Sequence, residues 1–169
     1  MMLQTGSLVR TVVLSTLLAG FAGACATNPV TGRRELSFVS ESQEIAMGQQ
    51  GAQEVRQSMG LVQDAALQEY VRTIGMRLAR ESERPGLPWS FEVVDDAAVN
   101  AFALPGGPIF VTRGILAFMQ NEAELASVLG HEIGHITAKH SVQQISRTQL
   151  AQGLLGVGSI LSSEVAAIA

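Results

Sequence analysis

The sequence predicts an α+β fold, rich in helix, with a small sheet that has an exposed edge. Two helical patterns precede residue 80, β-forming residues cluster over 90–112, and a third helical pattern follows residue 121. A length of 169 residues suits one domain.

Two helices are predicted in the first half of the chain. Ser40 followed by Gln43 fits a capping box that opens a helix over 41–58. Gly48 and Gly51 weaken this helix, which indicates close packing against another element. Over 67–78, apolar residues recur at three- and four-residue steps and predict a second helix, which the sequence RPGLP ends.

Short strands are predicted next. The run 90–94 alternates and is rich in β-formers, and two extended runs flank the turn from Pro105 to Pro108 like a hairpin. Proline on both sides of that turn favours positions at a sheet edge for both runs. A short helix is expected over 115–119.

The third long helix is predicted to begin after Asn121, which fits an N-cap with Glu124 three positions on. It is expected to run to about His140 or slightly beyond. The tail over 150–169 is apolar and rich in glycine.

The first 24 residues have the parts of a secretory signal: Arg10, an apolar run over 11–24, and small residues at its end. The sequence FAGAC, which ends at Cys25, resembles a bacterial lipobox, although Ala22 stands where leucine is usual. We therefore expect a signal peptide over 1–24, lipidation of Cys25, and a tether over 25–39. The alternatives are an ordinary signal peptide or an N-terminal membrane anchor, with Cys25 incidental.

Composition excludes several classes of function. The net charge of −4, the single lysine and the sparse aromatic residues argue against nucleic-acid binding. The single cysteine rules out an internal disulfide and any site built from several cysteines.

The candidate catalytic motif is HEIGH, from His131 to His135. Residues four apart on a helix share a face with Cβ atoms about 5–6 Å apart, so both imidazoles can reach one zinc ion at roughly 2.0–2.1 Å. Glu132 is rotated by about 100°, close enough to address a metal-bound water without ligating the metal. The alternative, ordinary surface or capped histidines, is disfavoured because polar groups among apolar neighbours are costly unless something pairs with them.

A third histidine follows nine residues after His131. On a continuous helix that spacing is about 900°, which places His140 on the opposite face. The sequence therefore predicts that His140 is a cation at the helix C-terminus and interacts with the helix dipole, not a metal ligand.

Three blocks, NPVTGRRELSFVSESQE, NAFALPGGPIFVTRGIL and NEAELASVLGHEIGHITAKHS, together resemble the HtpX/Oma/BepA family of zinc metallopeptidases, most closely its secreted lipoprotein branch. The resemblance implies a zincin-like domain over 40–169 with one zinc ion per chain. It implies that His131 and His135 bind the zinc and that Glu132 is catalytic. It also implies that an edge strand aligns the substrate peptide, with these residues: Asn100, Ala101, Phe102, Ala103, Leu104.

The family's third zinc ligand is a glutamate in a Glu-x-x-x-Asp pattern on a later helix. Glu164 does not match, because Ile168 stands four positions after it. We therefore expect 40–169 to be the N-terminal part of such a domain, truncated before the site is complete.

The function expected from these observations is metal-assisted hydrolysis of peptide bonds in envelope or misfolded proteins. Partners would be protein or peptide substrates and the membrane, through a lipid anchor on the periplasmic side of the bacterial outer membrane. The alternatives are a metal-binding lipoprotein that holds client proteins without cleaving them, an inactive fragment, and a membrane-embedded peptidase whose tail spans the bilayer.

Overall fold

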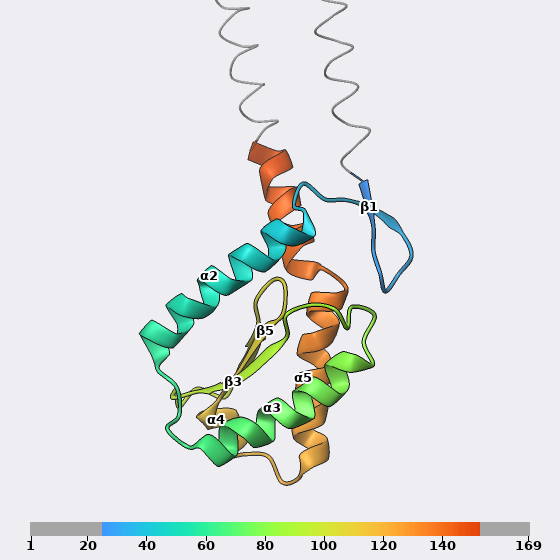
Figure 1. Ribbon diagram of the computed structural model, residues 1–169. Helices are drawn as coiled ribbons and strands as arrows, with labels where there is room; N and C mark the ends of the chain where they lie inside the picture. Colours follow the sequence, from blue (N-terminus) through green and yellow to red (C-terminus); the bar gives the residue numbers. More distant parts are fainter. Residues whose placement is uncertain (1–24, 153–169) are drawn as a thin grey trace, which may run out of the picture.

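The structure is a computed structural model and describes residues 25–152 (Figure 1). The predicted signal peptide and most of the apolar tail lie outside these residues. The elements are β1 (Cys25–Thr27), β2 (Arg34–Leu36), α2 (Glu41–Met59), α3 (Ala65–Arg80), β3 (Ser90–Val94), β4 (Ala101–Ala103), β5 (Pro108–Thr112), α4 (Arg113–Leu116) and α5 (Glu122–Thr137). The chain is helical again over 140–152.

The sheet has three strands in the order β3-β5-β4. β3 and β5 are parallel, and β4 is antiparallel to β5. The sheet lies between helices: α3 and α5 cover one face, and α2 covers the other (Figure 1). The predicted α+β class is confirmed.

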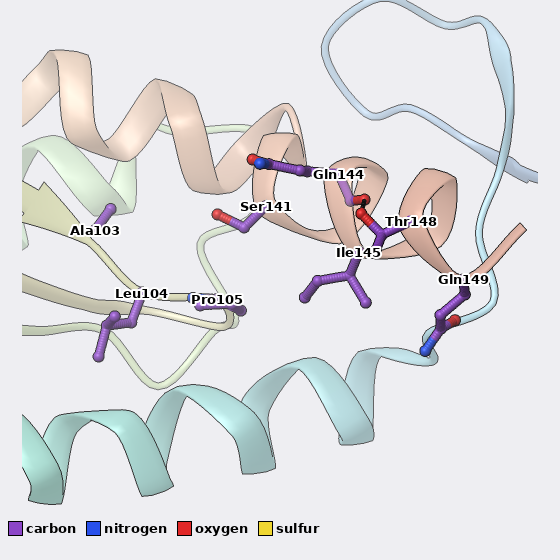
Figure 2. Close-up of a pocket in the computed structure, with 8 residues that line it drawn as sticks. All are labelled: Ala103, Leu104, Pro105, Ser141, Gln144, Ile145, Thr148 and Gln149. Atoms are coloured by element: carbon purple, nitrogen blue, oxygen red, sulfur yellow. Dashed lines mark hydrogen bonds between the residues drawn. The ribbon is translucent and has the colours of Figure 1, made fainter. Parts of the chain in front are cut away.

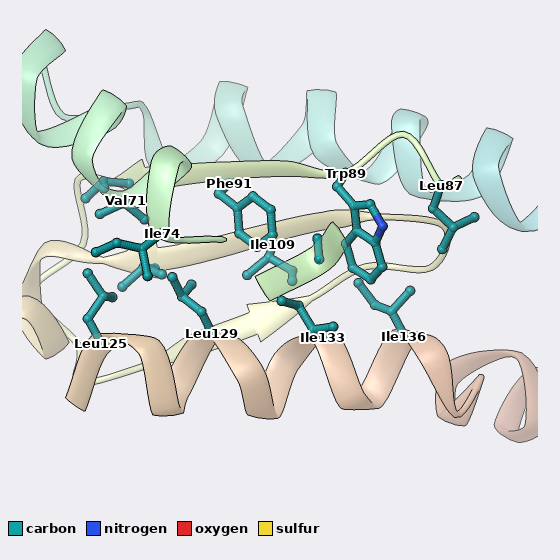
Figure 3. Close-up of a cluster of buried hydrophobic side chains, with 13 residues drawn as sticks. Val71, Ile74, Leu87, Trp89, Phe91, Ile109, Leu125, Leu129, Ile133 and Ile136 are labelled. Atoms are coloured by element: carbon teal, nitrogen blue, oxygen red, sulfur yellow. The ribbon is translucent and has the colours of Figure 1, made fainter. Parts of the chain in front are cut away.

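The main core lies between the sheet and the pair α3–α5 (Figure 3). One row of side chains from α5 points toward the strands and meets Phe91 and Ile109 from the sheet. A smaller cluster on the other face joins Ala52 of α2 to Phe110 and Val94. Because β5 has an apolar cluster on both faces, all five of its residues are buried.

The sequence predicted most elements closely. Ser40 and Gln43 form the reciprocal capping box of α2, and strand Ser90–Val94 is found with the predicted bounds. Gly48 packs as expected, because a Cβ there would lie 1.8 Å from the carbonyl oxygen of Pro105. α2 therefore presses against the turn that joins β4 to β5.

Two expectations about strands were wrong or incomplete. β4 is at the sheet edge, but β5 is central. Pro108 is tolerated there because it is the first residue of the strand, where a missing N–H interrupts little of the ladder. The segment predicted as a tether also contains a short antiparallel hairpin, β1–β2.

Within residues 25–152, no helix combines the length and the apolar character needed to cross a membrane.

Candidate metal centre

Helix α5 is the platform of the site. Asn121 caps it by accepting a hydrogen bond from the backbone N–H of Glu124, and the Glu124 carboxylate accepts from the backbone N–H of Gln120. Glu124 therefore has a capping role, as expected. The inward face of the helix is anchored in the core by Leu125, Leu129, Ile133 and Ile136, none more than 5% exposed.

The two histidines of the motif lie together on the other side of α5. The Nε2 atoms of His131 and His135 are 3.0 Å apart, and the rings meet edge to face with centroids 4.6 Å apart. His131 is exposed and His135 is half-buried. The predicted convergence of the two imidazoles is thus present in the structure.

Glu132 lies beside this pair and is half-buried. Burial raises the pKa of its carboxyl group, while the nearby His135 and His131 act in the opposite direction. A raised carboxyl pKa suits a group that must first accept a proton and later release it.

The donor set fits a divalent metal ion. Two nitrogens 3.0 Å apart can both lie about 2.0–2.1 Å from one ion, the usual Zn–N distance. Among the residues that the structure describes, no group of three or more His, Cys, Asp or Glu side chains is placed to hold a metal. The described part of the chain would therefore supply two ligands, and Glu164 lies outside it.

The expectation that His140 lies on the opposite face of a continuous helix was wrong. α5 ends at Thr137, and Lys139 adopts a left-handed backbone conformation, φ 57°, at the position after the cap. The chain therefore turns before the next helix begins. His140 returns to the site, and its Nδ1 lies 2.7 Å from Nδ1 of His135.

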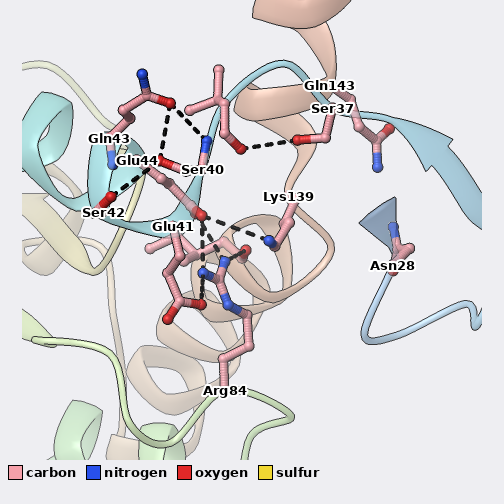
Figure 4. A network of polar contacts seen from close by, with 12 residues as sticks. Asn28, Ser37, Ser40, Glu41, Ser42, Gln43, Glu44, Arg84, Lys139 and Gln143 are labelled. Atoms are coloured by element: carbon pink, nitrogen blue, oxygen red, sulfur yellow. Dashed lines mark hydrogen bonds and ion pairs between the residues drawn. The ribbon is translucent and has the colours of Figure 1, made fainter. Parts of the chain in front are cut away.

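Polar side chains from distant segments hold this bend (Figure 4). Arg84, 7% exposed, forms a buried ion pair with Glu44 of α2 and donates to the carbonyl of Ile136 at 3.2 Å. Burial alone would lower the pKa of Arg84, but its hydrogen bonds to Glu44 and Glu41 raise it above the usual value. Arg84 thus stays charged beside the carbonyl of Ile136 at the end of α5, which also accepts from the backbone N–H of Lys139.

The β1–β2 hairpin contacts the same bend. Asn28, 3% exposed, donates to the carbonyl of Ala138 at 3.0 Å, and Gln143 donates to the same oxygen at 2.9 Å. Asn28 also accepts from the backbone N–H groups of Val30 and Thr31. The lead-in segment therefore helps to fix the C-terminal end of α5.

β4 offers backbone groups at the sheet edge, next to α5. The N–H of Leu104 donates to the carbonyl of Pro108, and the N–H of Thr112 donates to the carbonyl of Asn100. Because hydrogen-bonded pairs alternate along an antiparallel ladder, the backbone groups of Ala101 and Ala103 face away from β5. That outer edge could accept an extended chain.

A cleft adjoins the end of this strand (Figure 2). It has a volume of about 480 Å³ and lies between the β4–β5 turn and the helix over 140–152. Leu104 and Pro105 line one side, and Ile145 projects into it from the other. Most of its surface is apolar.

Comparison with known proteins identifies the family. The model of peptidase family M48 matches residues 65–167. The chain is 30% identical to the beta-barrel assembly-enhancing protease of Escherichia coli (strain K12) and 32% identical to that of Yersinia pestis, covering 91% and 89% of this chain but 32% and 33% of the relatives. It is also 36% identical to the mitochondrial metalloendopeptidase OMA1 of Schizosaccharomyces pombe, over 72% of this chain and 37% of that protein.

The chain thus spans about a third of the length of these relatives. The match includes the helix that bears HEIGH, and the family's peptidases depend on a metal. On these grounds the chain belongs to peptidase family M48.

Proposed function

We propose that this chain carries the active-site helix of a zinc-dependent metalloendopeptidase. The convergence of His131 and His135, with Nε2 atoms 3.0 Å apart and a half-buried Glu132 between them in sequence, is the observation that supports it most strongly. His131 and His135 would hold one zinc ion as neutral imidazoles. A residue outside 25–152 would supply the third protein ligand that catalytic zinc usually has.

Bound zinc would activate a water molecule and polarise the scissile carbonyl. Glu132 would accept the proton of the attacking water and then donate it to the leaving amine. The half-buried setting of Glu132 favours the first of these steps, because a raised pKa makes its carboxylate a stronger base toward the attacking water.

The edge of β4 would align the substrate peptide. An extended chain can pair with the outward backbone groups of Ala101 and Ala103 as an added strand. The apolar cleft beyond Leu104 would then receive an apolar side chain of the substrate. Proteins with exposed, extended segments are the substrates that this arrangement suits.

Replacing Glu132 by Gln tests whether Glu132 acts as the base while His131 and His135 bind the zinc. Glutamine keeps the size and helix propensity of glutamate, so zinc content should be unchanged. It cannot act as the base, so casein hydrolysis should fall by orders of magnitude. Hydrolysis is measured in a chain that includes the third ligand. His135→Ala should lower zinc content and activity together. Zinc retained by the unsubstituted chain without cleavage of any protein would favour a holding protein instead.

Replacing Ala103 by Pro tests the edge strand. The substitution removes an N–H that faces away from β5, so the sheet should survive while peptide hydrolysis falls and zinc content stays constant. Ala103→Ser keeps the N–H and is the matched control. Equal hydrolysis by both variants would show that β4 does not align the substrate.

We also propose that residues 1–24 are a signal peptide and that Cys25 carries a lipid anchor, which would place the protein on the periplasmic side of the outer membrane. The support is the apolar run that ends in small residues directly before Cys25. Mass spectrometry of the mature N-terminus should find a diacylglyceryl cysteine at position 25. An unmodified start elsewhere, or an uncut N-terminus, would contradict the proposal.

A further inference from the structure

The bend after α5 places a third imidazole, that of His140, beside His135 in the candidate metal centre. Nδ1 of His140 is 2.7 Å from Nδ1 of His135, whereas Nε2 of His135 faces His131. The two nitrogens of His135 therefore have different partners. Nε2 faces His131, and Nδ1 faces His140.

This arrangement fixes where the protons lie when a metal is bound. A neutral imidazole carries one N–H, and a metal-binding Nε2 must be free of hydrogen, so the proton of His135 is on Nδ1. Nδ1 of His135 then donates, and Nδ1 of His140 accepts. Metal-binding histidines commonly donate their second N–H in this way, which sets both the tautomer and the ring orientation.

Burial does not explain the position of His140, because its side chain is exposed. The backbone places it instead. Lys139 turns the chain, Arg84 binds the carbonyl of Ile136, and Asn28 binds the carbonyl of Ala138. The contacts of Arg84 and Asn28 come from two distant segments, so the bend does not depend on the His135–His140 bond alone.

We propose that His140 is a positioning residue of the metal centre, which accepts the Nδ1 proton of His135 and thereby presents Nε2 of His135 to the metal. This inference rests on the proposed function, since it requires His135 to be a metal ligand. It assigns His140 a role through His135 and not as a ligand itself.

The test compares two substitutions of His140. In His140→Asn, the side-chain oxygen takes nearly the place of Nδ1 and can still accept, whereas His140→Leu removes the acceptor. Affinity for Zn²⁺ is measured on the 169-residue chain by competition with a chelating dye. The Leu variant should bind about 10–100-fold more weakly, and the Asn variant should recover most of that loss. Ser141→Ala, an exposed neighbour, is the control and should bind like the unsubstituted chain.

A spectroscopic measurement on the unsubstituted chain provides a second readout. Nitrogen-15 NMR of the zinc-bound protein should show His135 protonated at Nδ1, with a coupling across the hydrogen bond to Nδ1 of His140. His140→Leu should abolish that coupling. If His140 does not accept this proton, no such coupling should appear.

Three results would overturn the proposal. The first is unchanged zinc affinity in His140→Leu while His135→Ala loses zinc, which would leave the proposed function intact. The second is equal loss in the Leu and Asn variants, which would make His140 a ligand. The third is a His135 proton on Nε2 in the zinc-bound protein. Unchanged zinc binding in His135→Ala would instead contradict the proposed function itself.

Discussion

The two sides of α5 differ in side-chain polarity and in exposure to solvent. The inward side is a row of apolar side chains at three- and four-residue steps, nearly closed to solvent (Figure 3). The other side carries His131 and His135, which are exposed or half-buried. It also carries Gly130 and Gly134, near whose Cβ positions the described residues place no neighbouring atom. One helix thus forms a wall of the core and would also support the proposed metal site.

The difference shows how a small domain can hold two imidazoles in register without burying them. The core fixes the helix, and the four-residue spacing then fixes the relative position of the rings. Stability and metal binding should therefore respond to different substitutions on the same helix.

The largest stability effect should come from the inward side. Leu129 is fully buried, so Leu129→Ala should lower the free energy of unfolding by about 2–5 kcal/mol through lost burial and a cavity. Urea denaturation measures this, and Ser127→Ala on an exposed position should stay within about 0.5 kcal/mol of the unsubstituted chain. Equal stability of the two variants would contradict the assigned core.

A smaller loss is expected where α2 meets the β4–β5 turn. Gly48→Ala would place a Cβ against the carbonyl oxygen of Pro105 and should cost about 1–3 kcal/mol, by the same denaturation measurement. Gly51→Ala is the matched control on the same helix, because its nearest neighbour is the flexible side chain of Leu104 at 3.2 Å. A cost at Gly51 as large as at Gly48 would show that the contact with the turn is not decisive.

The smallest effect, of opposite sign, is expected on the open side of α5. In Gly134→Ala, the new Cβ would meet no atom of residues 25–152 within 4 Å. The substitution should therefore raise the free energy of unfolding by about 0.5–1 kcal/mol through helix propensity. Thermal unfolding of the 169-residue chain measures it. A loss of stability would mean that this side is packed against something outside the described residues.

The sequence predicted what depends on local pattern. The capping residues Ser40 and Asn121 and the apolar period of α3 fixed three helices, and the four-residue spacing predicted that His131 and His135 converge. Local pattern was sufficient because the helix itself determines these positions.

It did not predict what depends on distant contacts. No glycine or proline marks the bend at Ala138 and Lys139, which is held by Arg84 and Asn28 from segments far away in the chain. The position of His140 therefore could not be foreseen. The central place of β5 was missed for a similar reason, because strand order arises from packing and a proline at the first strand position fits either place.

Under the proposed function, the outer side of α5 binds a metal ion through His131 and His135. Titration of Zn²⁺ into the 169-residue chain, His131→Ala, His135→Ala and the control Ser127→Ala tests this. We expect one zinc ion per chain in the unsubstituted and control proteins. Each histidine variant should bind only at background level while its unfolding free energy stays near that of the control. Zinc binding that persists unchanged in both histidine variants would show that His131 and His135 are not the metal ligands.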